Sequence, residues 1–453
     1  MTDVVPQHLV LVLPSTGEFD SRTYRIATTC LARGHEVTVV ARHKAGLPWR
    51  EDHPAGFTMI RVAASAEDGL PLQPLVRGLR WGRRRLGSII TGRRSPSPGT
   101  SAGRPSERTG ATGATGASRP PLLVRLWTSA FRRVAIPLQI RSHRRAARRA
   151  APRGDLVHGM AFMGIPVALT VGKRDAIPVV YDARDIHLDA RNIARMGRPA
   201  RWLLGRMERG WAMAASRVIS VNDAYADVLA SRWPIERPLV VMNCSYRFTP
   251  PSPKERLFHA ALDLPSTEKV VLYHGGLFPW RGIEQLIEAI VDVPDATLVL
   301  MGYGVLEAEL RARAADPATG GRVRVMAAVP PAELHAWVAA ADVAAMPIQG
   351  DTLNHRLTTP NKLFEAMAAG VPAVVSDLPG MSTIVRDAGS GILVDPTDPV
   401  AIAGAIRSIT ELDDGAWRAR RERCVAAAHD RYNWETQVDR LLDAYTSLTG
   451  KRW

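Results

Sequence analysis

Short apolar runs alternate with longer helical segments along most of the chain. Residues 9–13 form a continuous apolar run, residues 21–32 have helical spacing and stop before Gly34, and residues 36–40 form a second strand-like run. A continuous apolar run suits a strand of a parallel sheet that is buried on both faces. Strand, helix and strand in this order form a βαβ unit, so the start of the chain predicts a doubly wound α/β domain.

The same alternation begins again after residue 155 and once more after residue 270. The segment 246–269 contains Pro250-Pro251-Ser252-Pro253, which indicates a linker because proline interrupts helices and sheets. Two βα arrays separated by one linker predict two doubly wound domains. The predicted strands are 156–158, 178–181, 217–221 and 239–243 in the first array, and 270–273, 298–301, 323–325, 343–346 and 373–375 in the second.

Charge is distributed very unevenly along this chain. Of the 453 residues, 46% are apolar and 23% are charged, which is ordinary, and the net charge is +15. Residues 71–154 contain 19 Arg and one Glu but no Lys or Asp, which is +18 and leaves −3 for the remainder. Within that segment, residues 91–121 are rich in Ser, Pro, Gly and Thr. They cannot bury enough apolar surface to form a core, so we predict that they are disordered.

Three features indicate a cytoplasmic protein. Cys30, Cys244 and Cys424 are scattered and odd in number, which favours a reducing compartment without disulfides. Residues 1–7 lack the basic and apolar regions of a signal peptide. No apolar run reaches the length that spans a membrane.

The segment from Thr359 to Asp377 has the most specific local chemistry. We predict a helix that Thr359 caps, with Pro360 at its first position and Gly370 as its left-handed stop. The first turn of a helix has free N–H groups and binds anions, whereas Lys362 in that turn opposes the helix dipole. A bound anion would remove this conflict. Glu365 lies five residues after Pro360, which is about 7.5 Å along the helix axis. The alternative is a solvated Lys362 and an ordinary surface Glu365.

The run Pro360-Asn361-Lys362-Leu363-Phe364-Glu365-Ala366-Met367-Ala368-Ala369-Gly370-Val371-Pro372 resembles the donor-site motif of family-4 glycosyltransferases, which are retaining enzymes of the GT-B fold. The resemblance implies that Glu365 binds the ribose of a nucleoside diphosphate sugar. The motif's other glutamate would fall at Leu357 and is missing, as in a subgroup common in surface-polysaccharide synthesis.

The same resemblance implies two Rossmann-like domains that face each other across a cleft. The expected acceptor domain is 1–248, with the insert at about 91–121, and the linker is 249–268. The expected donor domain is 269–430, and the helix at 431–453 crosses back to the first domain. Donor binding is implied for Gly275, Gly276, Arg281, Gly302, Val329, Pro330, Asn361, Lys362, Leu363 and Glu365.

Arg281 and Lys362 are the expected cations for the leaving diphosphate. Glycines after a strand let backbone amides approach a phosphate, and Arg281 can chelate its oxygens. Gly302-Tyr303-Gly304 resembles the loop near the base, although a simple turn explains these residues equally well. The histidines His158, His274 and His355 are more often structural than catalytic.

The acceptor side is implied by two loops of the first domain. The loop containing Gly17, Asp20 and Arg22 resembles the family's opening segment, although Gly17 also fits an ordinary tight turn. Asp182-Ala183-Arg184-Asp185 resembles a motif that usually has histidine at the position of Arg184. Arginine stays protonated, so Arg184 would stabilise phosphate charge or orient an acceptor. Arg184 and Asp182 are the expected catalytic residues of this loop, and Asp185 is expected on the acceptor side. The alternative is a structural ion pair of Arg184 with Asp182 or Asp185.

The expected reaction is transfer of a sugar from a nucleoside diphosphate sugar to a glycan or lipid-linked acceptor, with retention of configuration. The chain has no Asp-x-Asp pair and no cluster with metal spacing, so we expect no metal and no cofactor. Two alternatives remain: a GT-B sugar-nucleotide epimerase, and an Arg-rich nucleic-acid-binding protein on an inactive transferase fold. Few aromatic residues lie among the arginines, so we expect no nucleic acid partner.

The Arg-rich segment also raises the question of a membrane surface. Leu126, Trp127 and Phe131 form an apolar stripe in a predicted helix that Pro137 ends or kinks, and five arginines follow between 141 and 149. Such a helix suits the interface of an anionic membrane, which would place the protein peripherally at the inner face of the cytoplasmic membrane. The alternative is an ordinary helix of the first domain with a solvated basic face.

Overall fold

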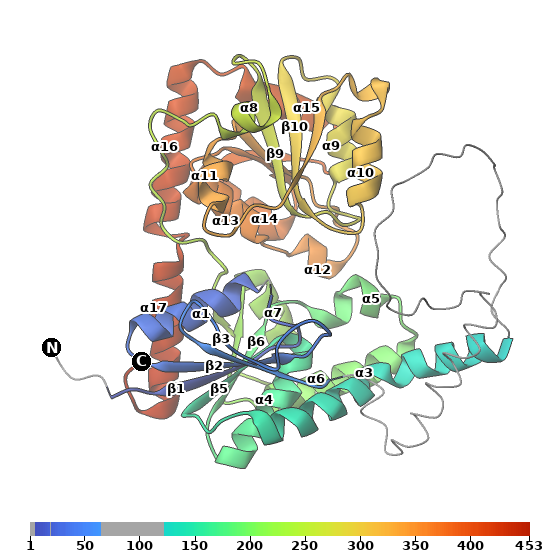
Figure 1. Ribbon diagram of the computed structural model, residues 1–453, viewed down its shortest axis with the longest axis vertical. Helices are drawn as coiled ribbons and strands as arrows, with labels where there is room; N and C mark the ends of the chain where they lie inside the picture. The colour runs from blue at the N-terminus through green and yellow to red at the C-terminus, as the bar shows by residue number, and fades with distance from the viewer. Residues whose placement is uncertain (1–4, 19, 65–121) are drawn as a thin grey trace, which may run out of the picture.

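The structure is a computed structural model that describes residues 5–18, 20–64 and 122–453. It has two lobes, one above the other in Figure 1, and each lobe is built on its own β-sheet. The two sheets, which are parallel apart from one edge strand, confirm the predicted α/β fold class. The segment predicted to be disordered, 91–121, lies outside the described residues.

The first lobe contains an eight-stranded sheet in the order β3-β4-β2-β1-β5-β6-β7-β8, in which only β3 is antiparallel to its neighbour. In the centre of this sheet, Val10 pairs with Thr38 on one side and Val157 on the other. The strands are β1 (His8–Val12), β2 (Glu36–Arg42), β3 (Arg50–Asp52), β4 (Thr58–Val62), β5 (Leu156–Met160), β6 (Val179–Ala183), β7 (Arg217–Ser220) and β8 (Leu239–Val240). The helices are α1 (Ser21–Ala32), α3 (Leu122–Ala150), α4 (Ala161–Asp175), η1 (His187–Asp189), α5 (Arg191–Ala194), α6 (Arg198–Ala214) and α7 (Asp223–Arg232).

The second lobe contains a six-stranded parallel sheet in the order β11-β10-β9-β12-β13-β14. Its strands are β9 (Lys269–Gly276), β10 (Ala296–Tyr303), β11 (Val323–Ala327), β12 (Val343–Met346), β13 (Ala373–Ser376) and β14 (Gly391–Val394). The helices after β8 are α8 (Leu257–Leu262), α9 (Ile283–Ile290), α10 (Glu307–Ala314), η2 (Pro317–Thr319), α11 (Leu334–Ala339), α12 (Leu353–Arg356), α13 (Asn361–Ala368), α14 (Pro379–Ala388), α15 (Pro399–Thr410), α16 (Asp414–Asp430) and α17 (Trp434–Thr449).

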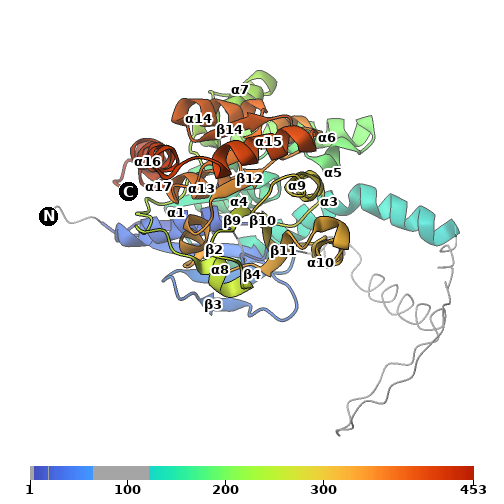
Figure 2. The ribbon, with the colours of Figure 1, turned by 90° about the horizontal axis from the view of Figure 1, so that it is seen from above.

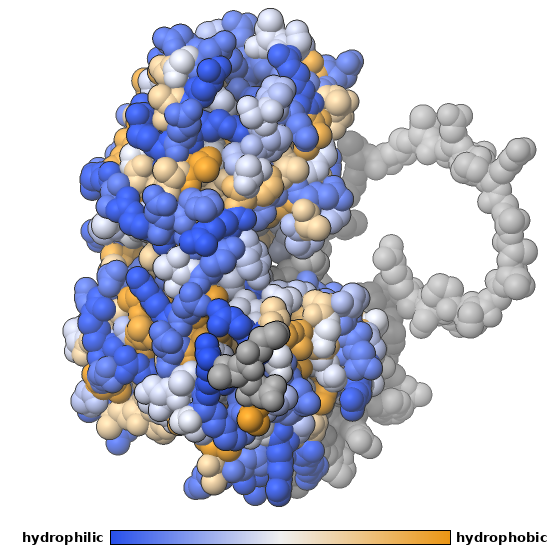
Figure 3. Space-filling model, turned by 90° about the vertical axis from the view of Figure 1, so that its left-hand side faces the viewer, coloured by the Kyte–Doolittle hydropathy of each residue, from blue (hydrophilic) through white to orange (hydrophobic). Residues whose placement is uncertain are grey.

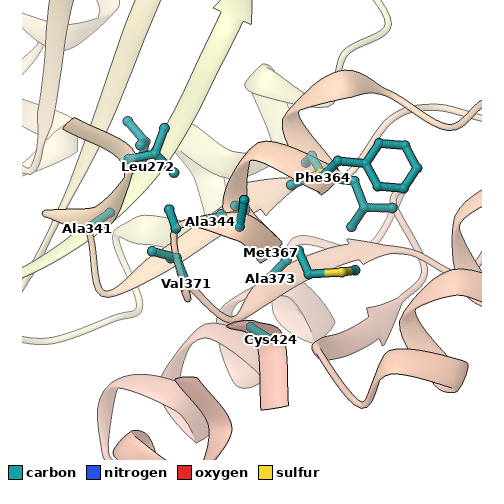
Figure 4. Close-up of a cluster of buried hydrophobic side chains, with 14 of the residues drawn as sticks. Leu272, Ala341, Ala344, Phe364, Met367, Val371, Ala373 and Cys424 are labelled. Atoms are coloured by element: carbon teal, nitrogen blue, oxygen red, sulfur yellow. The ribbon is translucent and has the colours of Figure 1, made fainter. Parts of the chain in front are cut away.

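Helix α13 is held by the core of the second lobe. Figure 4 shows Phe364 and Met367 of α13 among the side chains of the sheet and of α16, where Cys424 lies. Both side chains are almost completely buried, which stabilises the fold by roughly 1.5–3 kcal/mol for each. The tip of α13 is therefore fixed relative to the carboxyl ends of β9 and β13.

The last helix belongs to the core of the first lobe. Trp434, Leu441 and Tyr445 of α17 are buried against strands β1 and β2, while α16 runs along the second lobe (Figures 1 and 2). Asn433 caps α17 by accepting a hydrogen bond from the Thr436 N–H. On the face that Figure 3 shows, apolar side chains are scattered among hydrophilic ones.

Several predicted boundaries were wrong. Asp182 and Ala183, predicted to lie in a loop, complete β6, and the segment predicted as a linker contains α8. Helix α3 continues through Pro137 to Ala150, although proline removes one hydrogen bond of the helix. Among the residues that the structure describes, no helix combines the length and the apolar character needed to cross a membrane.

Candidate active site

Helix α13 begins one residue later than its sequence predicts. Pro360 has an extended backbone conformation at the N-cap position, so Thr359 is not the cap. Thr359 instead accepts a hydrogen bond from the Asn222 side chain. Within the described part of the chain, no group accepts from the backbone N–H of Asn361 or Lys362. The tip of this helix therefore keeps free donors for an anion.

Lys362 places a buried amine beside these donors. Its Nζ lies 3.5 Å from the ring centroid of Tyr273 and has no hydrogen-bond partner among the residues that the structure describes, although Lys362 as a whole is only partly buried. A Cβ built on Gly275 would lie 3.7 Å from this Nζ, so the amine faces the glycine turn after β9. Burial, and then the charge of Arg281, lower the pKa of Lys362, and Glu365 opposes them. A bound diphosphate would supply the missing partner.

Glu365 lies one turn deeper and is paired. Its Oε2 lies 2.9 Å from His274 Nε2, and its Oε1 lies 3.9 Å from Arg25 of α1. Burial raises the pKa of Glu365, but the hydrogen bond and charge of His274 and the charge of Arg25 outweigh burial and lower the pKa overall. An ionised carboxylate held in this way can accept hydrogen bonds from sugar hydroxyls.

Two glycines bring β9 and β10 close together behind this amine. Gly275 has φ +107°, and a Cβ on Gly302 would lie only 1.8 Å from the Gly275 carbonyl oxygen. Any side chain at Gly302 would therefore push β10 away from the turn that faces Lys362. Gly276 follows in the same turn, and its carbonyl accepts a hydrogen bond from the Tyr273 hydroxyl.

Arg281 follows the glycine turn and ends a short loop before α9. The residue is partly buried, and no described group forms a hydrogen bond or ion pair with its guanidinium. Burial lowers the pKa of Lys362 and raises that of Asp185, and the positive charge of Arg281 acts on both groups, one in each lobe. Gly282, next in the chain, has φ +75° and approaches the Pro347 carbonyl too closely for any Cβ, which fixes this loop.

The first lobe contributes two separate ion pairs at the ends of its strands. Arg184 donates two hydrogen bonds of 2.8 Å to Asp20, so the predicted partners Asp182 and Asp185 were wrong. Asp20 also caps α1 by accepting from the Thr23 N–H. Both side chains of this pair keep some exposed surface, so Arg184 can still meet a ligand.

Asp182 and Arg22 form a pair that has no exposed side-chain surface. Arg22 Nε donates to Asp182 Oδ2 at 2.6 Å, and His158 lies between Asp182 and the Tyr445 hydroxyl of α17. Burial raises the pKa of Asp182, but Arg22 and His158 outweigh it and lower the pKa overall. Neither Asp182 nor Arg22 can contact a substrate in this conformation, so the structure corrects their predicted catalytic and acceptor-side roles to a structural one.

Helix α12 joins the two lobes next to these groups. Asn354 accepts hydrogen bonds from the Ile186 N–H and the Tyr225 hydroxyl and donates to Asp185 at 3.1 Å. Leu357 packs with Ile186 and Tyr225, and its carbonyl accepts from Asn222 at 2.8 Å. The position where the family motif has a glutamate is therefore part of an interdomain contact.

Asn361 extends this contact to α1. It accepts from Asn243 at 2.6 Å and donates to Ser21 at 3.1 Å, and Arg25 donates to the same Asn243 side chain at 2.8 Å. The first turns of α1 and α13 therefore face each other across the two lobes.

The remaining residues predicted for the donor and acceptor sides differ in burial and in position. The Leu363 side chain is 1% exposed in the core of the second lobe, so only its backbone is available to a donor. Val329 and Pro330 lie in the loop after β11, and Gly17 has φ +85° in the loop before α1. The sequence reasoning missed Arg25, Asn354 and the role of His274. Arg25 follows Arg22 by three residues, so helical spacing could have indicated it, whereas nothing in the sequence marks Asn354.

Two Rossmann-like lobes, with the tip of α13 facing α1 of the first lobe, form the arrangement expected of the GT-B fold. Residues 268–411 match the family described as Glycosyl transferases group 1. A D-inositol 3-phosphate glycosyltransferase of Xylanimonas cellulosilytica is 32% identical over 214 residues, which cover 45% of this chain and 49% of the relative. The chain therefore spans about half the length of this curated relative.

Solved structures share the fold over the whole chain. Sucrose-phosphate synthase from Thermosynechococcus elongatus has a TM-score of 0.68 at 19% identity, covering 98% of this chain and 99% of that one. HepE of Anabaena in complex with UDP-glucose has a TM-score of 0.64 at 18% identity, covering 98% and 100%. These structures confirm the GT-B fold for this chain, and the match of residues 268–411 to group 1 glycosyltransferases agrees with the expected family.

Proposed function

We propose that this protein transfers a sugar from a nucleoside diphosphate sugar to a hydroxyl of a glycan or lipid-linked acceptor. The observation that carries the proposal concerns the described residues: the buried Nζ of Lys362, the first amides of α13 and the guanidinium of Arg281 have no hydrogen-bond or ion-pair partner among them. These groups suit the two phosphates of such a donor, and Glu365 suits its ribose. The binding of UDP-glucose by HepE supports this donor class.

In the proposed reaction, the bond between the sugar C1 and the diphosphate oxygen breaks. The acceptor oxygen attacks C1 from the same face, and its proton passes to the departing diphosphate oxygen, which retains the configuration. Lys362, Arg281 and the amides of α13 stabilise the growing negative charge, so no protein nucleophile is required. Arg184, held by Asp20, orients the acceptor at the edge of the first lobe.

We further propose that the reaction needs no metal, because Lys362 and Arg281 supply the positive charge. The test is a thermal-shift panel of nucleoside diphosphates and their sugars, followed by acceptor-dependent release of nucleoside diphosphate with and without EDTA. A binding donor raises the melting temperature by mass action. Absence of any shift across the panel would overturn the donor assignment. A large loss of rate with EDTA would overturn metal independence, and an inverted anomer in the product would overturn retention.

The basic face of α3 supports a peripheral membrane location at the inner face of the membrane. Arg141, Arg144, Arg145, Arg148 and Arg149 are exposed, whereas Ile140, His143 and Ala147 are buried toward the first lobe. The side chains of Leu126, Trp127 and Phe131 lie outside those that the structure describes. We therefore propose that the helix binds anionic lipid by charge, at about 1 kcal/mol for each arginine.

Changing Arg144, Arg145, Arg148 and Arg149 to Gln should release the protein from anionic vesicles in a sedimentation assay. Wild-type protein should also detach as salt rises, because screening weakens surface electrostatics. A wild-type protein that never sediments with anionic vesicles at low salt would end this part of the proposal.

A further inference from the structure

A second basic site lies on α6, away from the donor helix. A groove of about 740 Å³ is lined by four arginines, Arg201, Arg206, Arg209 and Arg232, and by no acidic residue. Apolar and aromatic side chains complete its wall, among them Trp202, Met213 and the buried Trp233. The groove thus combines positive charge with apolar surface.

The outward face of α6 has a regular composition. Trp202, Arg206, Arg209 and Met213 follow one another at intervals of four, three and four residues, so they form one stripe on the helix. Trp202 is 66% exposed and Met213 is 53% exposed. Leu204, Glu208 and Ala212 occupy the opposite, buried face of α6. The folding core therefore does not explain the apolar members of the outward stripe.

The arginines of the groove carry excess positive charge. Asp189 lies 2.7 Å from Arg232 and 3.6 Å from Arg201, so one carboxylate serves two guanidinium groups. In the described part of the chain, no carboxylate pairs with Arg206 or Arg209, and Arg206 only lies over the Trp202 ring. The buried Nε of Arg201 also has no acceptor. Guanidinium groups in this state bind phosphate oxygens in a bidentate manner.

Two glycines keep the groove open. A Cβ on Gly205 would approach Leu188 to 2.9 Å, so glycine lets Leu188 rest against the helix. A Cβ on Gly210 would meet nothing within 4 Å. Glycine weakens the interior of a helix, and a larger residue would fit at position 210. The packing of the fold therefore does not require a glycine there. Open space above Gly210 is what a ligand in the groove would occupy.

The groove lies beside the proposed acceptor side. Leu188 in η1 follows Asp185 by only three residues, and Asp185 contacts Asn354 of the second lobe. Helix α6 also shares a small apolar cluster with α3 and α4, through Leu204, Ile140 and Phe162. Figure 1 shows α6 and α3 together in the lower lobe. Leu204 lies on the face of α6 opposite the groove, so α3 packs behind α6, and η1 is the element that joins the groove to the acceptor edge.

We propose that this groove binds the phosphate of a lipid-linked acceptor, an inference that rests on the proposed glycosyl transfer. The arginines hold the phosphate, while Trp202 and Met213 contact the first part of the apolar chain. Exposed tryptophan next to arginine is typical of surfaces at a membrane interface, where one end of the ligand is apolar and the other is charged. A wholly water-soluble phosphate would leave these apolar side chains without a role.

The test compares two kinds of phosphatidylcholine vesicle with equal surface charge. One contains a polyprenyl phosphate and the other contains phosphatidylglycerol, and binding of the full-length protein is measured by sedimentation. Wild-type protein should prefer the polyprenyl phosphate vesicles by about tenfold, since the guanidinium groups of the groove can chelate a phosphate with more free oxygens than the diester of phosphatidylglycerol has. The double variant Arg206→Gln/Arg209→Gln should lose this preference. The control variant Arg148→Gln/Arg149→Gln removes the same charge from α3, should weaken both bindings alike, and should keep the preference.

Gly210→Leu tests the groove without changing charge. Leucine favours helix more than glycine does, so a loss of preference in this variant would come from filling the groove and not from unfolding. Retained preference in Gly210→Leu or in the groove double variant would overturn the proposal, as would its loss in the α3 control. If glycerol phosphate raises the melting temperature of the wild-type protein but the protein shows no preference between the two vesicles, the groove binds phosphate without recognising a lipid, and the lipid part of the proposal is overturned. Donor binding by calorimetry, measured in parallel, tests the proposed transfer separately.

Discussion

The two sides of the interface between the lobes differ in how their buried charges are paired. On the first lobe, Arg22 pairs with Asp182 and Arg184 pairs with Asp20. On the second lobe, the buried Nζ of Lys362 lies over the ring of Tyr273 and has no hydrogen-bond or ion-pair partner among the described residues. An unpaired buried charge is costly, so it persists where a ligand supplies the partner, whereas a paired charge holds structure. Burial of a charged side chain therefore does not by itself indicate a ligand-binding residue. A buried charge that lacks a partner in the protein is the better indicator.

The largest expected effect is on the stability of the first lobe. Asp182→Asn should lower the free energy of unfolding by about 3–5 kcal/mol, because it leaves the Arg22 charge buried without compensation. Urea unfolding measures this loss. The matched control is Asp439→Asn, which removes an exposed partner of Arg33 and should cost less than about 1 kcal/mol. Equal effects of the two variants would contradict a structural role for the Asp182 pair.

On the second lobe, the same kind of change should affect catalysis and spare stability. Lys362→Met should lower turnover by roughly 10²–10³-fold, which is about 2.7–4 kcal/mol of transition-state stabilisation. Its free energy of unfolding should stay the same or rise, because an unpaired buried amine is removed. Turnover at saturating donor and urea unfolding give both values. If Lys362→Met lost as much stability as Asp182→Asn, Lys362 would have a structural role like that of Asp182, and the proposed difference between the two lobes would be wrong.

Glu365 tests the contrast at an intermediate position, since it is paired yet faces the donor helix. Glu365→Ala should weaken donor binding by about 1–3 kcal/mol through lost hydrogen bonds to ribose. Isothermal titration calorimetry measures this affinity. Glu288→Ala, at an exposed position of α9 in the same lobe, is the control and should bind donor like the wild type. Wild-type affinity in Glu365→Ala would remove Glu365 from the donor site.

The smallest effect concerns protons. Burial lowers the pKa of Lys362 in the free protein, and a bound diphosphate would raise it again. Between these two values, donor binding takes up about one proton, so donor affinity should fall as pH rises, by at most about 1.4 kcal/mol per pH unit. Calorimetry in two buffers of different ionisation enthalpy counts this proton. The uptake should vanish in Lys362→Met, and its absence in wild-type protein would show that the amine is already charged.

The apolar patterning of the sequence was sufficient for the fold. Continuous runs such as 9–13 can be buried only between two helical layers, and Gly370 follows the end of α13 with φ +69°, as the sequence predicts. The donor helix was predictable for the same reason, because its cap, first turn and stop lie within a dozen residues. The exact start of this helix was not predictable, because the Thr359 hydroxyl accepts a hydrogen bond from Asn222 of the other lobe and does not cap the helix.

The α/β class, the motif that carries Lys362 and Glu365, and the concentration of arginine in one segment are all visible in the amino-acid sequence. The pairing of charges depends on the three-dimensional fold, because it joins residues such as Arg22 and Asp182 that are 160 positions apart. The fold also brought Asn354 to Asp185 and set the arginines of α6 around one groove. Local sequence patterns predict the conformation of residues that are close in sequence. The energy of a buried charge depends instead on the distant group that the fold places beside it.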